Sequence, residues 1–384
     1  MIETRFKKTD LGLIPEDWIV LSLGEIGEPC MCKRIMKNQT KLIGDIPFFK
    51  IGTFGGEPDA FISRQLFEDY KRNYHYPTKG DVLISAAGTI GRSVVYDGQD
   101  AYYQDSNIVW IDNDEHLVTN EYLSLCYKVI KWATTDGGTI TRLYNSNLRD
   151  SQIMAPSLID EQNRIAAAFS DIDALISDLE ALIEKKQNIK QGVMQELLSG
   201  KRRLDGFTGE WDYKTVKQIV GDIRRGTTLK SDDFVNGTVP VIAGGKQPAG
   251  FHNVANQNCD TITISGSGAS AGFLMIHHQP IFATDCSVIK ANTDFSLDFL
   301  FYRLVCIQSE IFKLQTGGAQ PHVYPRDIEK IEIQLPSKPE QIAIAKALTD
   351  MDEEISILQA RLDKYKQLKQ GMMQQLLTGR IRLI

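Results

Sequence analysis

Residues 161–204 read EQNRIAAAFSDIDALISDLEALIEKKQNIKQGVMQELLSGKRRL, and residues 340–383 read EQIAIAKALTDMDEEISILQARLDKYKQLKQGMMQQLLTGRIRL. The two stretches align without a gap. About half of the aligned positions are identical, far more than two helices of similar composition share by chance. The chain therefore contains an internal duplication.

Both copies have the spacing of one long amphipathic helix. Apolar residues recur at alternating steps of three and four, and charged residues occupy the other face. Neither copy contains a proline beyond its first turn, and about forty residues at ~1.5 Å each make a helix on the order of 60 Å long. The apolar positions form a predicted seam: Ile165, Phe169, Ile172, Ile176, Leu179, Ile183, Ile344, Leu348, Met351, Ile355, Leu358 and Leu362.

A single helix of this kind exposes its apolar seam to water, and the other copy is its most similar partner. We therefore predict that the two helices pack on each other as a coiled coil. The alternative is two unrelated surface helices, each lying on a separate globular core.

The segment before each helix has a β-rich pattern. Short apolar runs are separated by Gly, Asp and Asn, as expected for strands and turns. In the first segment the predicted strands are 46–52, 81–88, 93–96 and 106–112, followed by a predicted helix over 121–133. The second segment repeats this order of features, and Trp18 and Tyr144 of the first match Trp211 and Tyr324 of the second. The sequence thus predicts an α+β protein with these parts: domain 1–155, helix 156–204, domain 205–335 and helix 336–384.

Composition excludes several classes of protein. The chain has 384 residues, 42% of them hydrophobic, and a formal net charge of −6, so it does not resemble a protein that coats nucleic acid without specificity. No apolar run is long enough to span a membrane, and no basic, apolar leader starts the chain. The six cysteines include no C-x-x-C pair, which favours reduced thiols in a cytoplasmic protein.

No catalytic, cofactor or metal motif stands out. GSGASAG (266–272) could pass for a dinucleotide-binding turn, but FLMIHH follows it and reads as a strand where the fingerprint needs a helix. His277 and His278 would face opposite sides of that strand, so they cannot chelate one ion. Neither a phosphate-binding lysine loop nor an Asn-Pro-Pro-Tyr motif of adenine methyltransferases occurs. The absence of these motifs favours a protein that recognises another molecule over an enzyme.

The chain resembles the specificity subunit of type I restriction-modification enzymes. The resemblance rests on motifs whose order occurs twice: LGLIPEDW (11–18), APSLIDEQ (155–162) and LPSKPEQ (335–341) before the helices, and LLSG (197–200) and LLTG (376–379) after them. It covers the whole chain. It implies two target-recognition domains, each reading half of a bipartite double-stranded DNA site. It also implies two long antiparallel helices that set the half-site spacing, giving a pseudo-two-fold, circular arrangement.

The resemblance also implies partners and assigns chemistry to them. The helices would bind methyltransferase subunits, and two similar helix seams predict two copies of that partner. Restriction and translocase subunits would join through the complex. S-adenosylmethionine, ATP and Mg would be used by the partners, with no cofactor or metal in this chain.

Candidate DNA contacts come from polar and basic residues on predicted loops. Arginine suits guanine and asparagine suits adenine in the major groove, while hydroxyls and amides suit phosphates. In the first domain they are Arg64, Lys71, Arg72, Tyr74, Thr89, Arg92, Arg142, Tyr144, Asn145 and Ser146. In the second they are Arg224, Arg225, Thr227, Lys230, Lys246, Ser267, Ser270, His322, Tyr324 and Arg326. Ordinary solvated charge is the alternative for each one.

Two other functions remain open from the residues alone. A coiled-coil adaptor whose domains bind proteins or small ligands would share the helices and lack salt-sensitive DNA binding. A stand-alone methyltransferase or nuclease is disfavoured by the missing motifs and would have to bind S-adenosylmethionine without partners.

Overall fold

The computed structural model describes residues 5–132, 142–229 and 237–384. Contacts divide the chain into two compact units: unit 1 comprises residues 1–178 and 362–384, and unit 2 comprises residues 179–361. Each unit holds one β-rich domain, the first part of the long helix that follows it, and the last part of the other long helix. The four sequence segments expected above cut the chain differently, and their boundaries remain a prediction.

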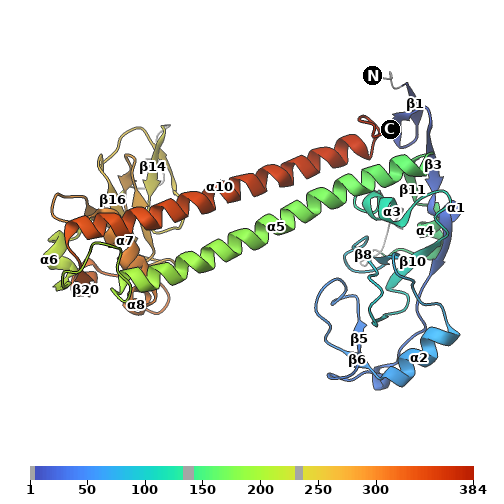
Figure 1. The fold of residues 1–384 in the computed structure, drawn as a ribbon, viewed down its shortest axis with the longest axis horizontal. Helices are drawn as coiled ribbons and strands as arrows, with labels where there is room; N and C mark the ends of the chain where they lie inside the picture. The colour runs from blue at the N-terminus through green and yellow to red at the C-terminus, as the bar shows by residue number, and fades with distance from the viewer. Residues whose placement is uncertain (1–4, 133–141, 230–236) are drawn as a thin grey trace. The chain divides into compact units, whose positions relative to one another are not determined.

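Unit 1 is built on small sheets that precede the first long helix (Figure 1). Its strands are β1 (Phe6–Thr9), β2 (Gly12–Pro15), β3 (Trp18–Ser22), β4 (Gly27–Cys30), β5 (Ile46–Phe49), β6 (Phe61–Ile62), β7 (Val82–Ser85), β8 (Ser93–Val95), β9 (Tyr102–Tyr103), β10 (Ile108–Asn113) and β11 (Gln152–Pro156). Its helices are α1 (Leu23–Ile26), η1 (Lys37–Gln39), α2 (Arg64–Asn73), α3 (Asn120–Cys126), α4 (Asn145–Asp150) and the first half of α5 (Ile159–Leu198).

Unit 2 contains the second set of small sheets. Its strands are β12 (Asp212–Thr215), β13 (Arg224–Arg225), β14 (Val239–Ile242), β15 (Gly250–His252), β16 (Thr261–Ser265), β17 (Leu274–His277), β18 (Phe282–Ala283), β19 (Cys286–Lys290) and β20 (Glu332–Leu335). Its helices are α6 (Val216–Val220), α7 (Leu297–Cys306), α8 (Gln308–Lys313), α9 (Pro325–Ile328) and the first half of α10 (Lys338–Leu376).

The two units share one topology. The four-stranded sheets have the orders β4-β10-β7-β8 and β13-β19-β16-β17, and the three-stranded sheets have the orders β6-β5-β9 and β15-β14-β18. In both three-stranded sheets the central strand has one antiparallel and one parallel neighbour. A two-stranded sheet, β3 with β11 or β12 with β20, leads into each long helix. The predicted α+β fold with an internal repeat is confirmed, and the duplication includes the domains.

The central strands of the four-stranded sheets hold the cores. Every residue of β7 (VLIS) and β16 (TITIS) is buried, as expected for a strand covered on both faces. In unit 1, residues of β7 belong to one apolar cluster with residues of α3 and the start of α5. In unit 2 the corresponding cluster includes α7 and β16.

The long helices pair in opposite directions inside each unit (Figure 1). In unit 1, Phe169 near the start of α5 shares an apolar cluster with Met372 and Leu376 near the end of α10. In unit 2, Leu348 near the start of α10 clusters with Leu197 near the end of α5. All twelve predicted seam residues are buried or half-buried. The prediction that the two helices pack on each other is therefore confirmed, and the alternative of two unrelated surface helices is wrong.

The predicted helix over 121–133 is too long, because α3 ends at Cys126 and the described residues after it are not helical. Within the described part of the chain, no helix is both long enough and apolar enough to cross a membrane.

Candidate nucleic-acid interface

Four predicted contact residues of unit 1 lie on α2 or directly after it. Ser63 caps this helix by accepting a hydrogen bond from the Leu66 amide at 3.3 Å. Arg64 occupies the first helical position, Lys71 and Arg72 lie in the last turn, and Tyr74 follows the helix. All four side chains reach the surface, as a contact with DNA requires.

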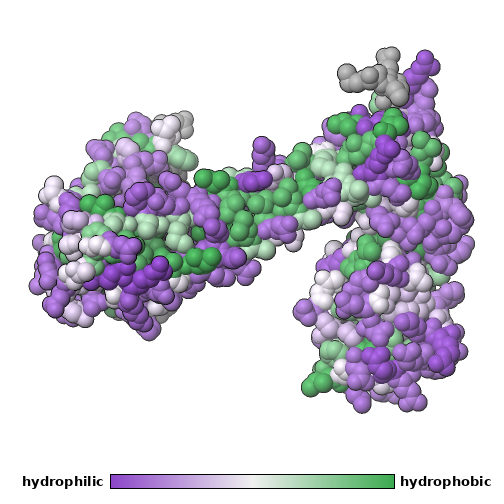
Figure 2. Space-filling view, viewed as in Figure 1, coloured by the Kyte–Doolittle hydropathy of each residue, from purple (hydrophilic) through white to green (hydrophobic). Residues whose placement is uncertain are grey.

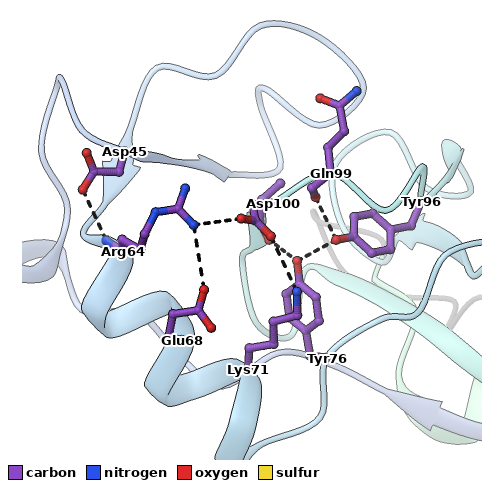
Figure 3. Close-up of polar contacts among 9 residues, drawn as sticks. Asp45, Arg64, Glu68, Lys71, Tyr76, Tyr96, Gln99 and Asp100 are labelled. Atoms are coloured by element: carbon purple, nitrogen blue, oxygen red, sulfur yellow. Dashed lines mark hydrogen bonds and ion pairs between the residues drawn. The ribbon is translucent and has the colours of Figure 1, made fainter.

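Two of these cations are already engaged by the protein (Figure 3). The Arg64 Nη1 atom lies 2.9 Å from Asp100 Oδ2, and the Lys71 Nζ atom lies 3.6 Å from Asp100 Oδ1. The hydrogen bond from Arg64 holds the pKa of the Asp100 carboxyl below its ordinary value and raises that of Arg64. These two residues therefore offer less positive charge to a phosphate than the sequence suggested, whereas Arg72 makes no ion pair with a described residue.

Two tyrosines, the half-buried Tyr76 and the buried Tyr96, fix the loop that carries Asp100 (Figure 3). The Tyr76 hydroxyl donates to the Ala101 carbonyl at 2.6 Å, and the Tyr96 hydroxyl donates to the Gln99 carbonyl at 2.7 Å. The Lys71 Nζ atom lies 5.0 Å from the centre of the Tyr76 ring. Sequence reasoning did not identify Asp100 as a partner of α2, because no local pattern links it to residues 36 positions earlier.

A second group in unit 1 surrounds the turn between β7 and β8. Gly88 and Gly91 have positive φ angles of 67° and 80°, and a Cβ on Gly91 would come within 2.2 Å of Trp132 Nε1, so glycine is required there. Thr89 is exposed on this turn, and the Arg92 Nη1 atom donates to the Phe54 carbonyl at 2.9 Å.

The segment before α4 is joined to this turn. The Leu143 amide donates to the Ala86 carbonyl at 2.8 Å, and Arg142 Nη2 donates to the Ser106 carbonyl at 2.7 Å. The Arg142 guanidinium lies 6.0 Å from the centre of the exposed Tyr144 ring. We call Thr89, Arg92, Arg142 and Tyr144 the unit 1 turn cluster.

The equivalent turn of unit 2 joins β16 to β17. Gly268 and Gly272 have positive φ angles of 79° and 89°, and the Val323 amide donates to the Gly266 carbonyl at 3.2 Å. The Ser267 hydroxyl donates to the Asp285 carboxylate. Since β16 and β17 are antiparallel, this turn is a hairpin and not the strand-to-helix turn of a dinucleotide site.

Cations and rings gather around this hairpin. The His322 ring stacks on Tyr324 with centres 6.2 Å apart, and the Arg326 guanidinium lies 5.0 Å from the Tyr324 ring centre. The Lys246 Nζ atom lies 5.4 Å from the Phe273 ring centre. A Cβ on Gly266 would come within 3.2 Å of Arg225 Nη2, so Arg225 belongs here too. We call this set the unit 2 turn cluster: Arg225, Lys246, Ser267, His322, Tyr324 and Arg326.

The remaining predicted contacts are scattered or not placed. Asn145 and Ser146 are exposed at the start of α4, next to Tyr144. Arg224 and Thr227 are exposed on β13 and just after it, and the Ser270 carbonyl accepts a hydrogen bond from the Phe273 amide at 2.9 Å within the hairpin. Lys230 lies outside the described residues.

The two histidines at the end of β17 lie in different surroundings. His277 on β17 is half-buried and its Nε2 atom lies 2.9 Å from the Thr263 hydroxyl, while His278 is exposed near Asp260 and Asp298. Burial lowers the pKa of His277 to about 4. No group of three or more metal-ligating side chains occurs among the described residues.

Comparison with a family model matches both repeats. The model, described as the type I restriction modification DNA specificity domain, matches residues 15–191 and again residues 208–367. A protein from Haemophilus influenzae described as a type I restriction enzyme specificity subunit is 57% identical over 160 residues, which is 42% of this chain and 41% of that protein. The MjaX specificity subunit of Methanocaldococcus jannaschii is 25% identical over 99% of this chain and 97% of its own length.

Solved structures share the fold over nearly the whole chain. The type I restriction-modification S subunit from M. genitalium covers 97% of this chain, and 98% of its own chain is matched, with a TM-score of 0.66 and 18% identity. A second similar chain comes from a structure on complex assembly and conformational transition of the type I restriction-modification system. It has a TM-score of 0.57 and 16% identity, and the match covers 96% of this chain and 99% of that chain.

Proposed function

Because the chain belongs to the type I restriction modification DNA specificity family, we propose that it selects the DNA sequence on which partner subunits act. Each domain reads one half of a bipartite, asymmetric double-stranded DNA target. The chain itself performs no chemical step. Two methyltransferase subunits supply methyl transfer from S-adenosylmethionine, and restriction subunits supply cleavage driven by ATP with Mg.

One observation carries this proposal: the two units keep the same frame and differ in the side chains that the frame presents. The hydrogen bond from Leu143 to Ala86 has its counterpart between Val323 and Gly266. At the turn beside that shared junction, Gly91 is followed by Arg92 in unit 1, whereas Gly272 is followed by Phe273 in unit 2. A conserved frame with divergent surface groups suits two readers of different half-sites.

The long helices support the role of a spacer. α5 has 40 residues and α10 has 39, so each helix is on the order of 60 Å long at ~1.5 Å per residue. Two half-sites on one face of the duplex are separated by about 35 Å per helical turn. A pair of helices of this length is sufficient to set such a spacing.

Exposed apolar residues on the helices support partner docking. Leu182 and Ile189 of α5 and Ile357 and Leu368 of α10 remain exposed after the seam is formed. Figure 2 shows apolar surface along the helices. Apolar side chains that gather on an exposed surface mark contact sites for other proteins, and the repeat offers two related sites for two methyltransferase subunits.

Co-purification and DNA binding test the proposal. The full chain is co-expressed with a type I methyltransferase subunit from the same host. Binding of the complex to host-genome fragments is then measured between 50 and 200 mM salt, a range over which ~10³-fold losses are expected for several phosphate contacts. We expect a complex with two methyltransferase subunits per chain and salt-sensitive, sequence-selective binding. Stable co-purification with no DNA binding would instead establish a protein-interaction adaptor.

A further inference from the structure

Two exposed tyrosines occupy the same place in the two units. Tyr144 directly precedes the short helix α4, and Tyr324 directly precedes α9. The residue before each tyrosine, Leu143 or Val323, donates its amide hydrogen bond to the turn after β7 or β16. Tyr144 is 55% exposed and Tyr324 is 36% exposed. Exposed positions usually diverge between duplicated domains, since changes there cost little stability. The same exposed residue in both units therefore needs a reason other than core packing.

Each tyrosine ring also has a cation beside it, supplied from a different sequence position. Arg142, two residues before Tyr144, lies 6.0 Å from that ring centre, and Arg326, two residues after Tyr324, lies 5.0 Å from the other. The Arg326 Nε atom is 3.9 Å from Asp327, a long contact on an exposed side chain. The pairing of ring and guanidinium is thus kept although the arginine is not at an equivalent position.

The hydroxyl groups are available to an external acceptor. Neither tyrosine side chain bonds to the helix that follows it, and among the described residues no hydrogen bond involves either hydroxyl. A phenolic hydroxyl and a guanidinium at one site can offer one neutral and one charged donor to the DNA backbone. Phosphate oxygens of DNA accept hydrogen bonds from both groups.

Two half-sites of different sequence have the same sugar-phosphate backbone, so both domains can contact it in the same way. We propose that Tyr144 with Arg142, and Tyr324 with Arg326, form equivalent contacts with a DNA phosphate, one in each domain, and contribute no base discrimination. This inference rests on the proposed function. It assigns sequence reading to groups that the two units do not share, such as Arg72 in the last turn of α2 in unit 1 and Lys246 in unit 2.

Conservative variants of the full chain, purified with its methyltransferase partner, test the inference. Tyr144→Phe and Tyr324→Phe keep the ring and remove only the hydroxyl, while Arg142→Gln and Arg326→Gln remove the charge. Tyr213→Phe is the matched control, because Tyr213 is exposed on β12 and its hydroxyl accepts a hydrogen bond from Gln334 within the protein. Affinity is measured at several salt concentrations for a duplex with the mapped motif and for a scrambled duplex.

The two kinds of variant have different expected signatures. Loss of one hydroxyl–phosphate bond should weaken binding about 10-fold to both duplexes alike and leave the salt dependence unchanged. Loss of one arginine should reduce the slope of log affinity against log salt by about 0.9. The methylated motif in cells should keep its sequence in every variant, and Tyr213→Phe should behave as the original chain.

Each contrary result has one meaning. A changed base preference in one half-site would show that the tyrosine reads bases. Unchanged affinity for both duplexes in the Tyr→Phe variants would show that the hydroxyls contact nothing on DNA. If the original complex binds neither duplex, the proposed function itself is wrong, and that outcome is separate from failure of the variants alone.

Discussion

Arg382 binds the buried carboxylate of Glu161 with two hydrogen bonds, of 2.6 Å from Nε to Oε1 and 2.8 Å from Nη2 to Oε2. Arg203 binds Glu340 in the same way in unit 2, at 2.5 and 2.7 Å. Both arginines also lie over a tryptophan ring, Trp18 in unit 1 and Trp211 in unit 2. The last residues of the chain therefore contact the first domain as the residues after α5 contact the second.

Replacing Arg382 should destabilise unit 1. Glu161 is only 2% exposed, so Arg382→Met leaves a buried carboxylate without its partner, which costs roughly 3 kcal/mol. We expect faster hydrogen exchange in α5 residues of unit 1, measured by mass spectrometry on the full chain, and little change in the α7 peptide of unit 2.

Two further variants isolate the cause. Glu161→Gln combined with Arg382→Met removes the uncompensated charge and should recover part of the loss. Arg380→Met is the matched control, because Arg380 is exposed two positions away. Exchange in Arg382→Met at the rate of the original chain would show that the pair does not stabilise unit 1.

The stability of unit 2 should depend on the titration of His277. Its folded pKa of about 4 lies below the ordinary value of 6.5, because burial disfavours the charged ring. Between these values the unfolded chain binds a proton that the folded chain does not, so stability is complete above about pH 6.5 and falls as the pH drops toward 4. The pKa difference sets an upper bound of about 3 kcal/mol on this change in the free energy of unfolding. Because the ring is half-buried and partly screened by solvent, we expect roughly 1–2 kcal/mol.

Urea unfolding at pH 7 and pH 5 measures this effect. His277→Gln should flatten the pH dependence while keeping a partner for the Thr263 hydroxyl. The control variant His278→Gln, at the exposed neighbouring residue, should retain most of the pH dependence. An identical pH dependence in His277→Gln and the original chain would rule out this histidine as the cause.

The helix seam should be required for assembly. Leu179 is buried and Leu358 half-buried in unit 2, so placing aspartate at both positions introduces unpaired charges into the seam, at a cost of at least about 3 kcal/mol. We expect the double variant to lose its methyltransferase subunits in size-exclusion chromatography while both domains stay protected from exchange. Aspartate at the exposed neighbours Ala181 and Gln359 should leave assembly intact, and assembly of the Leu179→Asp, Leu358→Asp variant would contradict the docking role.

Lengthening both helices should change the spacing of the target. Seven residues inserted after Ala181 and seven after Ala360, equivalent positions of the two repeats, keep the seam in phase and add about 10 Å per helix. The methylated motif should gain about three base pairs between unchanged half-sites. Altered half-sites at the original spacing would refute the spacer role.

The parts of the fold that sequence predicted are those with a regular period. The seam from Ile165 to Leu362 follows helical spacing, and strands such as β7 and β16 follow continuous apolar runs. The end of α3 could not be predicted, because no glycine or proline marks it in EYLSLCYKVIKWA. Tertiary packing sets that end: Trp132 packs on the Tyr127 ring at 5.3 Å and needs a glycine at position 91.

The candidate site was predicted less completely. Residue type and loop position pointed to Arg64 as well as to Arg142, yet the structure ties Arg64 to Asp100 and leaves Arg142 beside Tyr144. Such partners are distant in sequence and follow from loop geometry. A signal for the Arg382–Glu161 pair was present, because both residues are identical in the two repeats, as Arg203 and Glu340.

Mapping methylated bases in host DNA by long-read sequencing tests whether this chain selects the DNA target. The chain is expressed with its methyltransferase partner, and a strain lacking only this chain serves as the comparison. We expect an asymmetric, bipartite motif with a fixed gap, methylated in the first strain and unmethylated in the second. Methylation of the same motif in both strains would contradict this expectation.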